Sequence, residues 1–154
     1  MADADPFGLQ RFVDAQAGDY AQALAELRAG QKRSHWIWYV LPQVAGLGMS
    51  AMSQRFAIGS LAEARAYLAH PLLGARLREC VAALNVHRGR RSAVQVLGTV
   101  DAIKCRSSLT LFDAAAAGTE PLFTTALDAF FSGARDPATL ARLGAEPPPG
   151  APRC

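Results

Sequence analysis

An aromatic stretch at residues 32–43 constrains this chain more than any other part of its sequence. It contains both tryptophans, Trp36 and Trp38, together with His35 and Tyr39. Read as a helix, at about 100° per residue, its large side chains point in every direction, so no side is left for water. Burying their polar atoms requires hydrogen-bond partners, since an unpaired buried donor costs roughly 1–3 kcal/mol. We therefore expect this stretch to be central, with partners supplied by the core or by a ligand.

The sequence determines the secondary structure of this central stretch less firmly than its burial. Ser34 can cap a helix there, and Pro42 must end or kink it. The same residues also alternate acceptably for a strand, but we favour a helix.

Length and composition indicate one domain. The chain has 154 residues, of which 51% are hydrophobic, enough for a single core and too few for two domains. The start of the chain is acidic and lacks a secretory pattern, and no apolar run reaches the roughly 18 residues of a membrane span. We expect a cytoplasmic protein with one helical domain at residues 1–144 and a disordered, proline-rich tail at 145–154.

Helix-start signals recur along the whole domain and predict an all-α fold of seven or eight short helices. Asp-Pro pairs, capping serines and capping boxes precede apolar residues at helical spacing, and glycines follow them. The predicted starts are Asp5, Asp19, Ser34, Ser60, Pro71, Thr99, Leu122 and Asp136, and a single turn of helix is expected after Ser50.

A second polar constellation lies on the predicted helix that begins at Thr99. On a helical wheel Asp101, Lys104, Ser107 and Ser108 share a side with apolar residues. A charge that faces inward needs compensation, because desolvation is costly. One interpretation is a buried Asp101–Lys104 pair that stabilises the fold. The other is a cleft in which the lysine and the serine hydroxyls hold an anionic or polyhydroxyl ligand.

The first functional hypothesis joins these two constellations into one binding site. A compact helical domain can bring them together around a small anionic molecule such as a nucleotide, an ADP-ribose-like compound or a sugar phosphate, bound or also processed there. Gln43 is included as an amide beside a glycine-rich loop. The candidate ligand-binding residues are His35, Trp36, Trp38, Gln43, Asp101, Lys104, Ser107 and Ser108.

Neither a metal nor a cofactor is indicated by the cysteines and histidines. Cys80, Cys105 and Cys154 form no CxxC pair, and the three histidines stand far apart without acidic residues at ligand spacings. We expect reduced thiols, assign no metal, and leave the catalytic residues and any cofactor unidentified.

The second hypothesis is a non-enzymatic interaction module. The net charge of +3 and the basic run at residues 88–91 suit an acidic protein or nucleic acid. Against nucleic acid, the aromatic residues are not interleaved with the basic ones. Arginine also outnumbers lysine 14 to 2, so a single surface arginine carries little information.

The same motifs resemble the bacterial family called domain of unknown function 1810, some of whose members carry the misleading label calpastatin. The resemblance spans roughly residues 5–143 and is carried by residues 34–43, 46–48, 67–74 and 107–112, with Asp101 and Lys104. It implies a compact, mainly helical single domain and no particular activity. The aromatic block and the segment from Gly98 to Asp101 also resemble, more distantly, helical proteins that process ADP-ribose-linked metabolites.

Overall fold

The computed structural model describes residues 5–144, which form ten helices and no strand. The helices are α1 (Gln10–Gln16), α2 (Tyr20–Ala29), α3 (Ile37–Val40), α4 (Ala51–Arg55), α5 (Leu61–Ala69), α6 (Leu73–Asn85), α7 (Ala93–Leu97), α8 (Thr99–Ala116), α9 (Pro121–Phe131) and α10 (Pro137–Gly144). The predicted all-α class is confirmed. The helix count exceeds the prediction because α4, expected only as a turn, and α7, expected only as a short apolar segment, are helices of five residues each.

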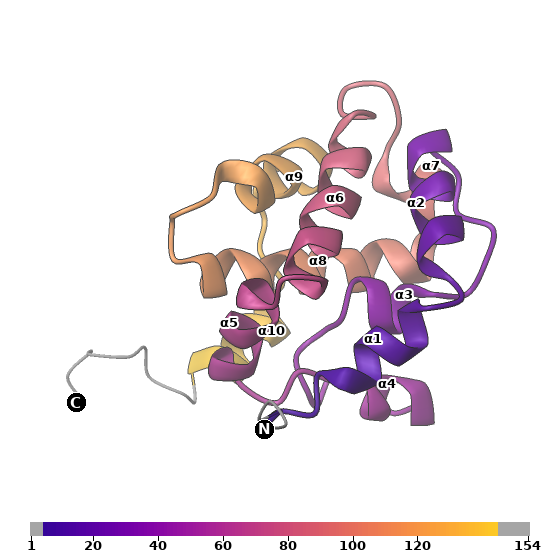
Figure 1. Ribbon diagram of the computed structural model, residues 1–154. Coiled ribbons are helices and arrows are strands. Elements are labelled where there is room, and N and C mark those ends of the chain that lie inside the picture. Colours follow the sequence, from indigo (N-terminus) through magenta and orange to yellow (C-terminus); the bar gives the residue numbers. More distant parts are fainter. Residues whose placement is uncertain (1–4, 145–154) are drawn as a thin grey trace.

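Helix α8 lies at the centre of the packing. It contacts α3, α5, α7, α9 and α10, while α6 packs against α2, α5 and α9 (Figure 1). Phe112 of α8 is completely buried, and its ring centre lies 5.2 Å from that of Tyr67 on α5 and 6.3 Å from that of Phe123 on α9. Tyr67 in turn meets Phe12 of α1 edge-on, with 5.2 Å between the ring centres. A row of buried aromatic rings therefore joins α9 to α1 through the core.

Some predicted helix caps, such as those of Ser60 and Asp136, are present, whereas others, such as that of Thr99, are absent. The Ser60 hydroxyl accepts a hydrogen bond from the Glu63 amide at 3.0 Å, and an Asp136 carboxylate oxygen accepts one from the Thr139 amide at 2.9 Å. Both satisfy N–H groups that the first turn of a helix leaves free. Thr99 does not cap α8, which begins at that residue and has no side-chain cap.

The aromatic stretch is central, as predicted, but little of it is helical. Trp36 and Tyr39 are buried, Trp38 is half-buried and His35 is exposed, so the expectation that no side faces water is wrong at His35. Helix α3 has four residues and no side-chain cap. The reason is that Ser34 hydrogen-bonds to another part of the chain, described below, and does not start a helix.

Within residues 5–144, no helix has both the length and the apolar character that crossing a membrane requires. Cys80 and Cys105 are buried free thiols, and burial raises the pKa of each to about 12. The predicted tail at residues 145–154, including Cys154, lies outside the described residues.

A close approach between α5 and α6 makes Gly74 a sensitive position. A Cβ atom added there would lie 2.1 Å from the Leu68 carbonyl oxygen, which is backbone and cannot easily move. We expect Gly74→Ala to lower the free energy of unfolding by about 1–3 kcal/mol through overpacking. Gly18→Ala is the matched control, because a Cβ at Gly18 meets nothing within 4 Å. Urea denaturation of both variants tests this, and equal losses would contradict it.

Candidate functional site

A buried carboxylate, Glu26, holds the start of the aromatic stretch in place. Glu26 is only 4% exposed. Its oxygens accept hydrogen bonds from the Arg33 amide at 2.7 Å, the Ser34 amide at 2.9 Å, the Trp36 indole nitrogen at 3.0 Å, and the side chains of Ser34 and Gln22. Burial alone would raise the pKa of this carboxyl, but the hydrogen bonds from Ser34, Arg33 and Gln22 together hold it well below its usual range. Trp36 therefore has its polar partner within the core.

Sequence reasoning missed Glu26, although a signal was present. Glu26 lies between Ala23 and Leu27, at the spacing of one helix face, and both of these neighbours are completely buried. An acid on the apolar face of α2 needs buried donors, and the donors are the amides and side chains of the segment that follows α2.

Asp101 pairs with Lys32, the other lysine of the chain. The Lys32 Nζ lies 2.8 Å from an Asp101 carboxylate oxygen, and the two side chains are 7% and 19% exposed. Lys32 also donates to the Ser34 carbonyl oxygen and lies 5.0 Å from the ring centre of Trp36. The hypothesis of an Asp101–Lys104 pair is therefore wrong, because a lysine from the segment after α2 occupies the carboxylate.

Lys104 instead lies over the other tryptophan. Its Nζ is 5.2 Å from the ring centre of Trp38, and both side chains are half-buried. Among residues 5–144 Lys104 has no ion-pair partner. In the same part of the chain, the Trp38 Nε1 and the Ser108 Oγ are buried without a hydrogen-bond partner. Ser108 follows Lys104 by one helical turn, so α3 and α8 together present a cation and an indole face. We call Lys104, Trp38 and Ser108 the Lys104 cluster.

Among the remaining predicted residues, Ser107 makes a structural contact through its side chain, whereas Gln43 and His35 make contacts through their backbone carbonyl groups. Ser107 is buried and its hydroxyl donates to Asp136 at 3.1 Å, which joins α8 to the start of α10. The Gln43 carbonyl oxygen accepts from the Ile58 amide at 2.9 Å, and the His35 carbonyl oxygen accepts from the Tyr39 hydroxyl at 3.2 Å. In the described part of the chain, no three His, Cys, Asp or Glu side chains are grouped to hold a metal ion.

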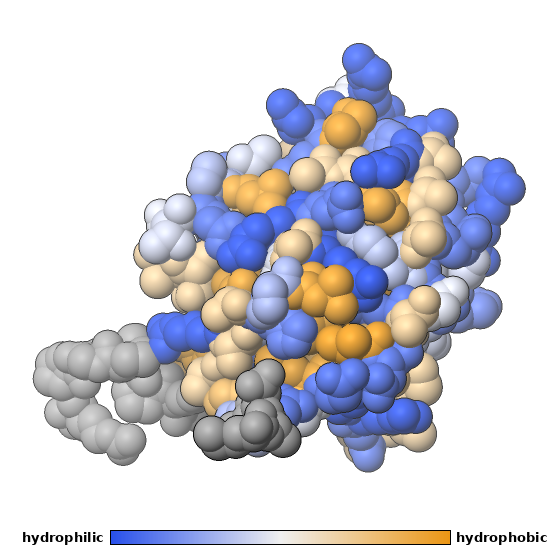
Figure 2. Space-filling model, viewed as in Figure 1, coloured by the Kyte–Doolittle hydropathy of each residue, from blue (hydrophilic) through white to orange (hydrophobic). Residues whose placement is uncertain are grey.

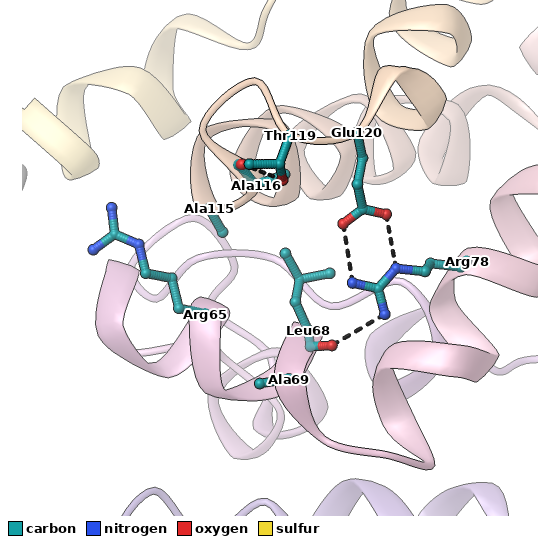
Figure 3. Close-up of a pocket in the computed structure, with 8 residues that line it drawn as sticks. All are labelled: Arg65, Leu68, Ala69, Arg78, Ala115, Ala116, Thr119 and Glu120. Carbon is teal, nitrogen blue, oxygen red and sulfur yellow. Dashed lines mark hydrogen bonds and ion pairs between the residues drawn. The ribbon is translucent and has the colours of Figure 1, made fainter.

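Two adjoining hollows lie elsewhere, beside the carboxyl end of α8, and have volumes of about 320 and 480 Å³. They meet at Thr119 and Glu120, and their linings contain none of the eight predicted residues. Figure 3 shows the smaller hollow, in which Arg78 is paired with Glu120 and also donates to the Leu68 carbonyl oxygen. Arg65 extends on the opposite side of Leu68. Figure 2 shows apolar surface exposed between strongly polar side chains on the face where α5 and α6 lie in Figure 1.

The sequence did not indicate these hollows, because their residues come from four helices and from the turns after α6 and α8. Of their charged members, Arg65, Arg78 and Glu120 stand in no motif, and Arg88 belongs to the basic run at residues 88–91, which did not indicate a cavity.

Comparison with known proteins identifies the family. The chain is similar to the conserved hypothetical protein Rv1873 from Mycobacterium tuberculosis, whose crystal structure matches with a TM-score of 0.88 and 46% sequence identity over 91% of this chain and 99% of that one. No curated protein matches the chain. The family model described as protein of unknown function (DUF1810) matches residues 6–143. The resemblance seen in the sequence is thus confirmed, and the chain belongs to the DUF1810 family.

Proposed function

We propose that this protein binds a small anionic molecule, such as a nucleotide, an ADP-ribose-like compound or a sugar phosphate, at the Lys104 cluster. The observation that carries the proposal is that Lys104 has no counter-charge in the part of the chain that the structure describes. The nearest acid on the same helix face, Asp101, is occupied by Lys32, so the Lys104 charge stays available to an external anion.

The surroundings of Lys104 suit a ligand that has both a charge and a ring. The Trp38 ring is half-buried and therefore keeps part of its surface accessible. Indole surfaces bind planar or apolar groups, while the ammonium group binds phosphate or carboxylate. Ser108 Oγ and Trp38 Nε1 are buried polar groups without a hydrogen-bond partner among residues 5–144.

Within this proposal the eight predicted residues have different roles. Lys104, Trp38 and Ser108 contact the ligand, and the exposed His35 lies three residues before Trp38 in the sequence. Trp36 and Asp101 position the site from within the core, through Glu26 and Lys32. Ser107 and Gln43 fix the neighbouring helices and loops.

The test is a thermal-shift screen with nucleotides, ADP-ribose, NAD and sugar phosphates, repeated on Lys104→Met. A ligand at one hundred times its Kd stabilises a protein by about 2.7 kcal/mol. We expect Lys104→Met to abolish this gain while lowering the stability of the free protein by no more than about 1 kcal/mol, because among the described residues the lysine loses only its contact with the Trp38 ring.

Arg90→Met is the matched control for this screen. Arg90 is exposed in the basic loop, and its side chain has no described partner, so the substitution removes the same charge elsewhere. Ligand stabilisation should persist in this variant. If Arg90→Met abolishes binding and Lys104→Met does not, the basic-loop interaction module replaces the Lys104 cluster. If no anionic metabolite raises the midpoint at millimolar concentration, the proposal fails.

A further inference from the structure

The larger hollow beside α9 has the size and the walls of a small-molecule site. Its volume of about 480 Å³ lies within the range of ligand pockets. One wall is the carboxyl end of α6, and the other is the first turn of α9, which has no side-chain cap. Ala82, Pro121 and Leu122 supply its apolar surface.

Asn85 gives this hollow an unpaired acceptor. The residue is 6% exposed and lines the hollow. Its Nδ2 donates to the Leu122 carbonyl oxygen at 3.4 Å, which fixes the amide orientation, whereas its Oδ1 accepts no hydrogen bond from the described residues. A buried acceptor without a partner is unfavourable, and a ligand group that donates a hydrogen bond to Oδ1 would satisfy it.

Arg88 gives the same hollow a free positive charge. The Arg88 side chain is anchored by one nitrogen, which donates to the Asn85 carbonyl oxygen at 2.9 Å, and its other nitrogens have no described partner. The acid in the lining, Glu120, is already bound by two nitrogens of Arg78 at 2.7 and 2.9 Å, as Figure 3 shows. The hydrogen bonds from Arg78 lower the pKa of Glu120, so this ion pair stays charged and closed at neutral pH.

We propose that this hollow is a second ligand site, distinct from the Lys104 cluster, and that it binds a free α-amino acid with an apolar side chain. The ammonium group donates to Asn85 Oδ1, and the carboxylate faces Arg88. Asn85 and Arg88 both lie at the carboxyl end of α6. This placement suits the short distance between the ammonium and carboxylate groups of an amino acid. The apolar side chain packs against Pro121 and Leu122.

The experiment is isothermal titration with L-leucine, together with amide chemical-shift mapping of the full chain. We expect shifts confined to residues 82–88 and 119–125. N-acetyl-L-leucine lacks the ammonium donor and L-leucinamide lacks the carboxylate, so each should bind at least about tenfold more weakly than leucine. Equal binding of N-acetyl-leucine or of inorganic phosphate would show a simple anion site and overturn the proposal.

Two variants and one control complete the test. Asn85→Leu and Arg88→Met should each weaken leucine binding at least about tenfold. Because Arg88 is exposed, the Arg88→Met variant should fold like the unmodified protein. Arg90→Met removes an exposed arginine of the same loop that does not line the hollow, and it should leave leucine binding unchanged. Undiminished binding in a folded Arg88→Met, or no shifts with 20 mM leucine, overturns the assignment.

Discussion

Replacing Glu26 with alanine is expected to lower the free energy of unfolding by at least about 3 kcal/mol, because several buried donors lose their acceptor together. The indole N–H of Trp36 and the amides of Arg33 and Ser34 all donate to Glu26. Urea denaturation monitored by tryptophan fluorescence measures the loss. Gln22→Ala is the control, since it removes one donor and leaves the carboxylate satisfied by the others, at a cost of about 1 kcal/mol. A loss no larger than that of the control would contradict the central role of Glu26.

The Glu26 contribution should also depend on pH. Its pKa in the folded protein is lowered from the ordinary value of about 4.3. The ionised form is therefore favoured by folding, and its stabilisation is fully present above about pH 5. As the pH falls through the folded pKa, the stabilisation disappears. The difference in unfolding free energy between the unmodified protein and Glu26→Gln should accordingly be largest at pH 7 and should decrease progressively as the pH falls below about 5.

The second large effect is expected at the Lys32–Asp101 ion pair. Lys32→Met and Asp101→Leu should each lower the free energy of unfolding by roughly 3–5 kcal/mol, because each leaves a buried charge without its partner. The double variant should recover much of that loss. A double-mutant cycle measures the coupling directly.

The control cycle combines Asp101→Leu with Lys104→Met. Lys104 contacts Trp38 and has no described contact with Asp101, so the two effects should add. Coupling of Asp101 to Lys104, with none to Lys32, would restore the pair that the sequence suggested.

The positions of the helices were largely predictable from the sequence, and the reason is local. The capping contacts of Ser60 and Asp136 join residues only three apart, so the sequence contains both partners side by side. The burial of Trp36 was likewise predictable from the apolar residues around it. The partners of the buried polar groups were not predictable in this way.

These partners depend on how distant segments pack. Glu26 and Lys32 both hydrogen-bond to the segment before α3. Lys32 also pairs with Asp101, which lies 69 positions further along the chain. Helical spacing made Lys104 the obvious partner for Asp101. Spacing within one helix, however, cannot predict that Lys32, which lies in another segment, packs beside Asp101. The apolar setting of Lys104 was predictable, but its missing counter-charge was not.

The fixed indole of Trp36 has a consequence for its neighbour Trp38. Because Trp36 is held by Glu26 at 3.0 Å and covered by Lys32, the backbone leading into α3 has little freedom to rotate. Trp38 is two residues further along and is therefore presented toward Lys104 before any ligand arrives. A ligand that binds there need not order the backbone, so little conformational entropy opposes binding, and even a small molecule with few contacts can reach a useful affinity.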